Sequence, residues 1–185
     1  MCRRVLATLI TCLVPIALHA TVLLPAEFRE IVNGADLIVY ARVTDTEVRW
    51  SDDRKHVDTL VTLQAGTYLK GGGGEILVIK VPGGTIGRYM NVLVGAPAFA
   101  AGDEAVFFLS SRGREYPAVF GLNQGVFRVA VDATTRRRLV TPPLMSRGSA
   151  RAPVVRGDAS RRPLPLETFG AQVQSVIAEA GRAAQ

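Results

Sequence analysis

Residues 35–81 constrain the fold most, because they hold three consecutive stretches in which apolar and polar side chains alternate. The stretches run from Asp36 to Arg49, from Val57 to Leu69 and from Glu75 to Val81. Alternation with a period of two is typical of β-strands that bury one face. Strands of about twelve residues are long for a flat sheet and typical of a sheet that bends around a barrel. Gly66, inside the second stretch, fits such a bend or a bulge.

Further strand-like stretches follow, separated by glycine-rich and proline-rich turns. They are Glu104–Leu109, Tyr116–Leu122 and Val126–Val131. The last two are separated by Asn123-Gln-Gly125, which predicts a hairpin with a three-residue connection. Six or so strands at this spacing predict an all-β fold. We expect a closed or partly open barrel of five to six strands.

Two helices are expected to flank the strands. Residues 25–34 repeat apolar side chains on one helical face, with Pro25 in the first turn and Asn33-Gly34 as a left-handed stop. After a change of composition, residues 165–183 regain a helical spacing and need a docking surface. The sequence leaves open whether that surface belongs to the same chain or to a neighbour.

Residues 1–20 predict a cleaved secretory signal peptide, since Arg3 and Arg4 precede an apolar run that ends at the small residue Ala20. We therefore expect a secreted or periplasmic protein, with the cut uncertain by a few residues. Lipidation of Cys12 is an alternative that stays open. The chain has two cysteines, Cys2 and Cys12, so removal of the signal would leave neither disulfides nor thiolate metal sites.

Four segments follow from these patterns: a signal peptide (1–20), a β-barrel domain (21–133), a linker (134–164) and an amphipathic C-terminal helix (165–183). The linker is rich in arginine and proline, although residues 138–141 are open to forming an edge strand. The formal charge of +6 is a weak indication of an anionic partner. The sequence does not decide whether the linker is ordered.

The order of these elements resembles the netrin-like domain, which the tissue inhibitors of metalloproteinases carry. The resemblance rests on Ala35-Asp36-Leu-Ile-Val39, on Tyr68-Leu-Lys-Gly71 and on the strand Gly102–Leu109, and it covers roughly residues 35–131. It implies an OB-type five-stranded barrel that binds a partner through its rim loops. Those inhibitors bind a protease's zinc through an N-terminal cysteine, which the processed chain would lack, so their mechanism is carried over to no residue here.

Three further segments, VPGG, GAPAF and GLNQGVF, resemble those of secreted bacterial proteins without an established activity. They imply the same compartment and no particular chemistry.

Catalytic and cofactor motifs are weak throughout. The glycine runs at 71–74 and 83–87 lack the lysine and the following helix of a phosphate-binding loop, so both predict structural turns. His56 is the one histidine beyond the signal and has Ser51 and Ser110 as arithmetically possible triad partners, but no Gly-x-Ser-x-Gly elbow exists. We expect a solvated turn residue, and we predict no catalytic residue and no cofactor.

Metal binding is not expected either. Five carboxylates bracket the turn around His56, which keeps calcium open as an alternative, but their spacing is not that of an EF-hand loop. They are Asp45, Glu47, Asp52, Asp53 and Asp58.

Large amphipathic side chains on loops are the candidate partner-binding residues: Trp50, Tyr89, Met90 and Phe99. The alternative is that they cap the ends of the barrel. We expect a secreted, non-enzymatic binding module for a protein or an anionic envelope component, with regulation of an exported protease as one form of this role. Nucleic acid is not expected, because export and the low aromatic content argue against it. A hydrolase using His56 and a structural envelope protein attached by its basic tail stay open, as do the ligand and the oligomeric state.

Overall fold

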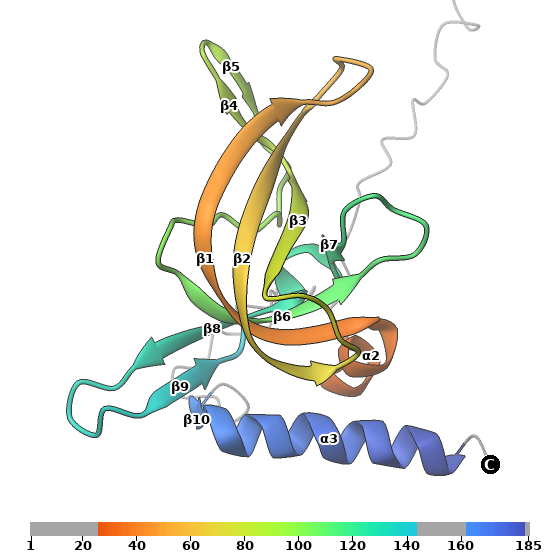
Figure 1. The fold of residues 1–185 in the computed structure, drawn as a ribbon, viewed down its shortest axis with the longest axis vertical. Helices are drawn as coiled ribbons and strands as arrows, with labels where there is room; N and C mark the ends of the chain where they lie inside the picture. The colour runs from red at the N-terminus through yellow and green to blue at the C-terminus, as the bar shows by residue number, and fades with distance from the viewer. Residues whose placement is uncertain (1–25, 144–161, 184–185) are drawn as a thin grey trace, which may run out of the picture.

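The computed structural model describes residues 26–143 and 162–183 (Figure 1). In chain order the elements are α2 (Phe28–Gly34), β1 (Leu37–Trp50), β2 (Val57–Lys70), β3 (Ile76–Pro82), β4 (Gly84–Ile86), β5 (Tyr89–Asn91), β6 (Glu104–Ser110), β7 (Ala118–Val119), a 3₁₀ helix η1 (Leu122–Gly125), β8 (Val126–Val131), β9 (Arg138–Thr141), β10 (Leu164–Pro165) and α3 (Leu166–Ala183). The predicted signal peptide, Cys12 and most of the predicted linker lie outside the described residues.

Five strands close into a mixed barrel in the order β1-β2-β3-β7-β6, with β6 returning to β1. Neighbouring strands are antiparallel except for β3 and β7, which are parallel. The barrel closes because β1 pairs with β2 along its length and also with β6 from Leu37 to Arg42. The prediction of an all-β barrel, closed or partly open, with a short N-terminal helix and a C-terminal helix is confirmed, and the barrel is closed.

A bulge at Gly66 allows β2 to bend around the barrel. Tyr40 pairs with Thr67 and Ala41 pairs with Ala65, so Gly66 is the extra residue of β2. A Cβ atom at Gly66 would lie 3.0 Å from Cδ1 of the Tyr40 ring, which is tighter than an ordinary contact. The bend predicted from this glycine is therefore confirmed.

The alternation along β1 and β6 divides the core into two parts. Val39 and Phe107 point into the barrel, whereas Ile38 and Phe108 point outward beneath the helices. The outer part contains an aromatic cluster made of Phe28, Phe108, Phe127 and Phe169. Because α2 and α3 cover this outer face, α3 docks on its own barrel, with Phe169 and Val173 buried. None of the helices in the described ranges is long and apolar enough to cross a membrane.

The ends of α2 differ from the prediction. The helix begins at Phe28, where Glu27 and Glu30 form a capping box in which the Glu27 amide donates to the Glu30 carboxylate at 2.9 Å, and Pro25 lies outside the described residues. Gly34 is not left-handed, and the chain leaves the helix through Ala35 in an extended conformation. Glycine is needed at position 34 for space, since a Cβ there would lie 2.5 Å from the ring of Phe120.

The prediction that residues 116–122 and 126–131 pair as a hairpin is wrong. Only Ala118 and Val119 form a strand, which pairs with β3 and β6, whereas β8 pairs with β6 and β9. The predicted turn is the helix η1, which joins two strands that follow one another along the same edge of β6. Gly125 permits this step, because a Cβ there would lie 2.6 Å from the carbonyl oxygen of Phe120.

Four short strands complete the fold, and of these the sequence offered only the one at residues 138–141, as an alternative. Residues 84–91, predicted as a structural loop and its continuation, form the hairpin β4–β5. An edge strand at 138–141 is present as β9, and β10 pairs with it just before α3.

Candidate partner-binding tip

Two hairpins project together from one end of the barrel (Figure 1). The pairing of β1 with β6 ends at Arg42. Beyond it, β1 continues with β2 as an arm that ends in the turn 51–56, and β3 pairs with the other edge of β2 from Asp58 to Gln64. The hairpin β4–β5 stands beside this arm. We call the turn 51–56, its flanking residue Trp50 and the hairpin β4–β5 the tip.

Close backbone packing holds β4 against the arm. The Thr59 hydroxyl donates to the carbonyl oxygen of Gly83 at 2.7 Å, and the Gly83 amide donates to the carbonyl oxygen of Val57 at 2.9 Å. Gly84 has a φ of +146°, and a Cβ there would lie 2.5 Å from Cγ1 of Val48. Glycine is therefore required at position 84, both by conformation and by space.

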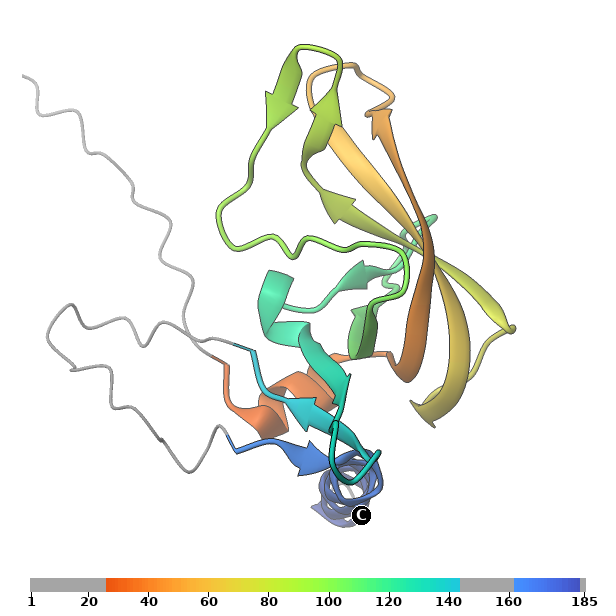
Figure 2. The same ribbon diagram turned by 90° about the vertical axis from the view of Figure 1, so that its left-hand side faces the viewer.

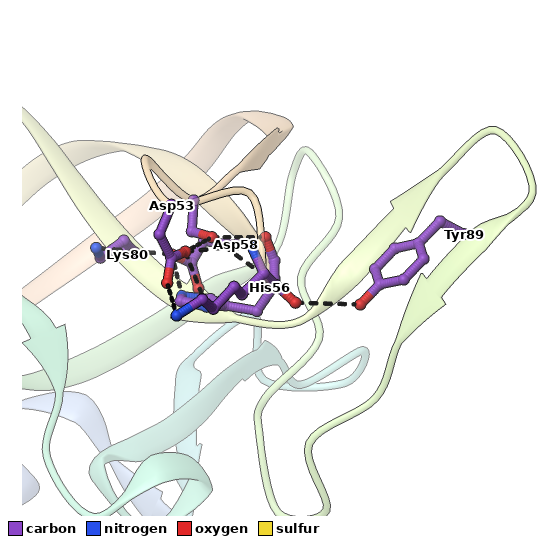
Figure 3. Close-up of polar contacts among 7 residues, drawn as sticks. Asp53, His56, Asp58, Lys80 and Tyr89 are labelled. Carbon is purple, nitrogen blue, oxygen red and sulfur yellow. Dashed lines mark hydrogen bonds and ion pairs between the residues drawn. The ribbon is translucent and has the colours of Figure 1, made fainter.

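An aromatic pair joins the two hairpins. The ring centroids of Trp50 and Tyr89 lie 4.6 Å apart with their planes inclined by 39°. The Tyr89 hydroxyl lies 3.5 Å from the carbonyl oxygen of Lys55, across the gap between the hairpins (Figure 3). The side chains remain 42% and 40% exposed, so each presents apolar surface to solvent.

The structure separates the four residues predicted to bind a partner. Trp50 and Tyr89 are in contact, and Met90 is the next residue of β5 and is 67% exposed. Phe99 lies elsewhere: its ring centroid is 5.5 Å from that of Phe107 inside the barrel, and the guanidinium of Arg128 lies 5.0 Å from its centroid. Phe99 therefore closes the barrel interior, which was the alternative interpretation of this group.

The sequence prediction missed three exposed apolar residues that follow β5, namely Val92, Leu93 and Val94. Val94 is 90% exposed. Together with Met90 they form what we call the apolar ridge. A signal was present in the sequence, because this short apolar run lies in a connection that has no predicted strand to bury it.

A polar cleft of about 380 Å³ is lined by Trp50 together with His56, Asp58 and Lys80. Its centre is Asp58, nearly buried, whose Oδ2 lies 3.6 Å from Nε2 of His56 and 3.6 Å from Nζ of Lys80 (Figure 3). Asp53 approaches the other side of the imidazole, at 3.8 Å from Nδ1. Hydrogen bonds from the Ser51 hydroxyl and the Lys55 amide hold the pKa of Asp53 below its usual range.

The serines that the sequence offered as partners of His56 make other contacts. Ser51 Oγ accepts from the main-chain amide of His56 at 3.1 Å and lies 2.6 Å from Oδ1 of Asp53. Ser110 Oγ lies 3.3 Å from Oδ2 of Asp36, which belongs to a different part of the barrel. The polar contacts that the structure gives the His56 ring are therefore with two carboxylates.

The carboxylates considered for calcium do not converge. Glu47 pairs with Arg49 at 2.7 Å, and Asp58 faces Lys80, so cations already neutralise two of the five. Within residues 26–143 and 162–183, no three His, Cys, Asp or Glu side chains gather closely enough to hold a metal ion.

No family model matches this chain, and no curated protein matches its sequence. Inference about function therefore depends on the geometry of the tip.

Proposed function

We propose that this protein is a secreted, non-enzymatic binding module that holds its partner with the tip. The observation that carries the proposal is the exposed Trp50–Tyr89 pair together with the exposed apolar ridge, which begins at Met90, the residue after Tyr89. Scattered apolar residues are normal on a protein surface, but a contiguous exposed group is typical of an interaction site. Tryptophan and tyrosine are also the residues that most often dominate binding energy at interfaces.

The position of the tip supports this role. α2 and α3 cover the opposite end of the barrel, so the two hairpins form an uncovered end (Figure 1). The hydrogen bonds from the Thr59 hydroxyl to Gly83 and from the Gly83 amide to Val57 hold the hairpins together before any partner arrives. A surface ordered in advance loses less conformational entropy on binding, which favours affinity.

Fold analogy gives additional, weaker support for binding through the rim of the barrel. The closed strand order, with β3 and β7 parallel, is compatible with the OB-type barrel that the netrin-like resemblance implies, and such barrels bind through rim loops. By this analogy we propose that the module is a partner or regulator of another exported protein, such as a protease. The predicted signal peptide supports export.

A photocrosslinking residue placed at position 90 tests the proposal in cells that produce the full chain. We expect adducts from position 90 and none from a matched probe at Ile76, which is also well exposed (59%) but lies at the start of β3. Equal adduct patterns from both positions, or adducts to neither protein nor lipid at position 90, would contradict a binding role for the tip.

A further inference from the structure

We propose that the surface bound by the tip is an anionic lipid bilayer, with the apolar ridge and the Trp50–Tyr89 pair entering its headgroup region. The inference rests on the proposed function, because it assumes that the tip is the binding surface, and it specifies the chemistry of what is bound.

The composition of the segment favours lipid over a polar partner. Residues 84–102 contain no aspartate and no glutamate, and their one charged residue is Arg88. Burial of a carboxylate in an apolar layer would cost a large desolvation energy, and this segment has none to bury. An arginine can instead keep its guanidinium at the phosphate level while its stem lies among apolar groups.

The geometry places the apolar side chains on the outside. Successive residues of a strand point to opposite faces, so Met90 points away from the face on which Tyr89 meets Trp50. The ridge continues from Met90 into the connection to β6, which loops away from the β1–β2 arm (Figure 2). Met90 is on the projecting hairpin, and Val92, Leu93 and Val94 are on the connection that runs from it back toward the barrel (Figure 2).

The polar groups of the tip match a headgroup region. Tryptophan and tyrosine concentrate at membrane interfaces, where the ring is in apolar surroundings and its N–H or O–H stays hydrated. Arg54, Lys55 and Arg88 lie in the two turns of the tip, where they would meet lipid phosphates. The same turns hold two exposed carboxylates, Asp52 and Asp53, and Asp53 faces Lys55 and His56, each at 3.8 Å.

The same hairpin limits the depth of entry. Among the described strands β5 pairs only with β4, so its outer edge keeps main-chain groups that need water or another partner. Such an edge is not tolerated within the hydrocarbon core. The contact is therefore peripheral and reversible, at the level where water is still present.

Trp50 is the single tryptophan of the chain, so its fluorescence reports on the tip alone. The experiment uses residues 21–185, which keep every described residue and omit the apolar leader, itself able to enter lipid. We expect phosphatidylcholine vesicles that contain phosphatidylglycerol to shift the Trp50 emission to shorter wavelength, and brominated acyl chains to quench it. Pure phosphatidylcholine should produce a weaker shift.

Replacing two ridge residues together, Met90→Asp and Val94→Asp, should weaken vesicle binding about tenfold or more. Each change removes an apolar side chain that would be buried in the lipid. The matched control changes Ile76→Asp and Val131→Asp, two residues that are also exposed but lie outside the tip. This control should bind like the unchanged chain. High salt should detach the protein from vesicles if only the arginine-rich linker (134–164) binds them, because salt screens charge attraction. Binding through the apolar ridge should persist in part.

Vesicle binding without a change in Trp50 emission would overturn the inference, because the arginine-rich linker (134–164) would then account for the binding. Protein adducts from position 90, combined with no response of Trp50 to vesicles, would keep the proposed function and overturn the lipid assignment. A concentration-dependent dimer that the ridge variant abolishes, again without a lipid response, would identify a second copy as the occupant. Absence of adducts, vesicle response and dimer would overturn both proposals.

Discussion

The ammonium of Lys70, in the last position of β2, donates a hydrogen bond to the main-chain oxygen of Val32 in α2 at 2.8 Å. It also reaches the carbonyl oxygens of Asn33 and Ala35, at 3.2 and 2.6 Å. The last carbonyls of a helix have no partner within the helix, so this ammonium satisfies them and fixes α2 to the barrel. Desolvation lowers the pKa of Lys70, and the charge of Asp36 opposes this effect.

Replacing Lys70 with methionine should therefore lower the free energy of unfolding by about 1–3 kcal/mol, since hydrogen bonds from a charged donor are lost and two partly buried carbonyls lose their partner. Chemical denaturation measures the change. The matched control is Lys55→Met on the tip turn, where the lysine side chain is 81% exposed and pairs with Asp53 at 3.8 Å. A similar loss in both variants would contradict a specific role of Lys70.

Glu104 should make stability depend on acid. Burial alone would raise the pKa of this carboxyl, but hydrogen bonds from Tyr40, Arg42 and Arg138 outweigh it and hold the pKa below its usual range. A depressed pKa means that the carboxylate stabilises the fold above the unfolded-state pKa, near 4.5, and that this stability is lost as the pH falls through the folded-state value.

The Glu104→Gln variant should lose about 1–3 kcal/mol at neutral pH, because it leaves two arginines without their carboxylate. Its stability should also fall less steeply than that of the unchanged chain below about pH 4.5. Melting curves across this range provide the measurement. Glu47→Gln serves as the control: its carboxylate pairs with Arg49 on an exposed surface, where solvent screens the pair, so its effect should be smaller.

Gly66→Ala should destabilise the barrel by about 1–3 kcal/mol, since the added methyl group overpacks the ring of Tyr40 at the bulge. Gly72→Ala is the matched change, because a Cβ at Gly72 meets nothing within 4 Å and its φ is not in the left-handed region. Thermal unfolding compares the two variants. Equal stability of both would show that the bulge tolerates a side chain.

Alanine variants of Trp50 and Phe99 should have opposite effects on partner binding and on stability. Trp50→Ala removes an exposed ring and should reduce the yield of adducts from position 90 while changing stability little. Phe99→Ala removes a ring that packs on Phe107, so it should lower the free energy of unfolding by about 2–4 kcal/mol. This range lies below that of a fully buried phenylalanine, because Phe99 is only partly buried. The adduct yield of the folded fraction should stay unchanged. The reverse pattern would place the partner site at Phe99.

The sequence by itself determined the long strands and the flanking helices. Alternation along residues 36–49 and helical spacing along residues 165–183 indicate which face of each element is buried. These patterns repeat within one element, so they can be recognised without knowing what packs against it. Strand length and Gly66 predicted a barrel that was closed or partly open, and the pairing of β1 with β6 shows that it is closed. The unbroken apolar run Ala105–Leu109 belongs to a strand that is covered on both faces, by the barrel interior and by the helices.

Tertiary structure alone decided the site. Phe99 and Tyr89 are both aromatic residues of the same glycine-rich connection, yet Phe99 packs on Phe107 and Tyr89 meets Trp50 at the surface. Their different roles depend on which distant strand lies beside each one, and no local pattern contains that information. The same reason explains the hairpin β4–β5, which is held by Thr59 and Val48, and the pairing of β8 with β6 and β9. An apolar ridge is exposed only because nothing else in the described fold packs over it.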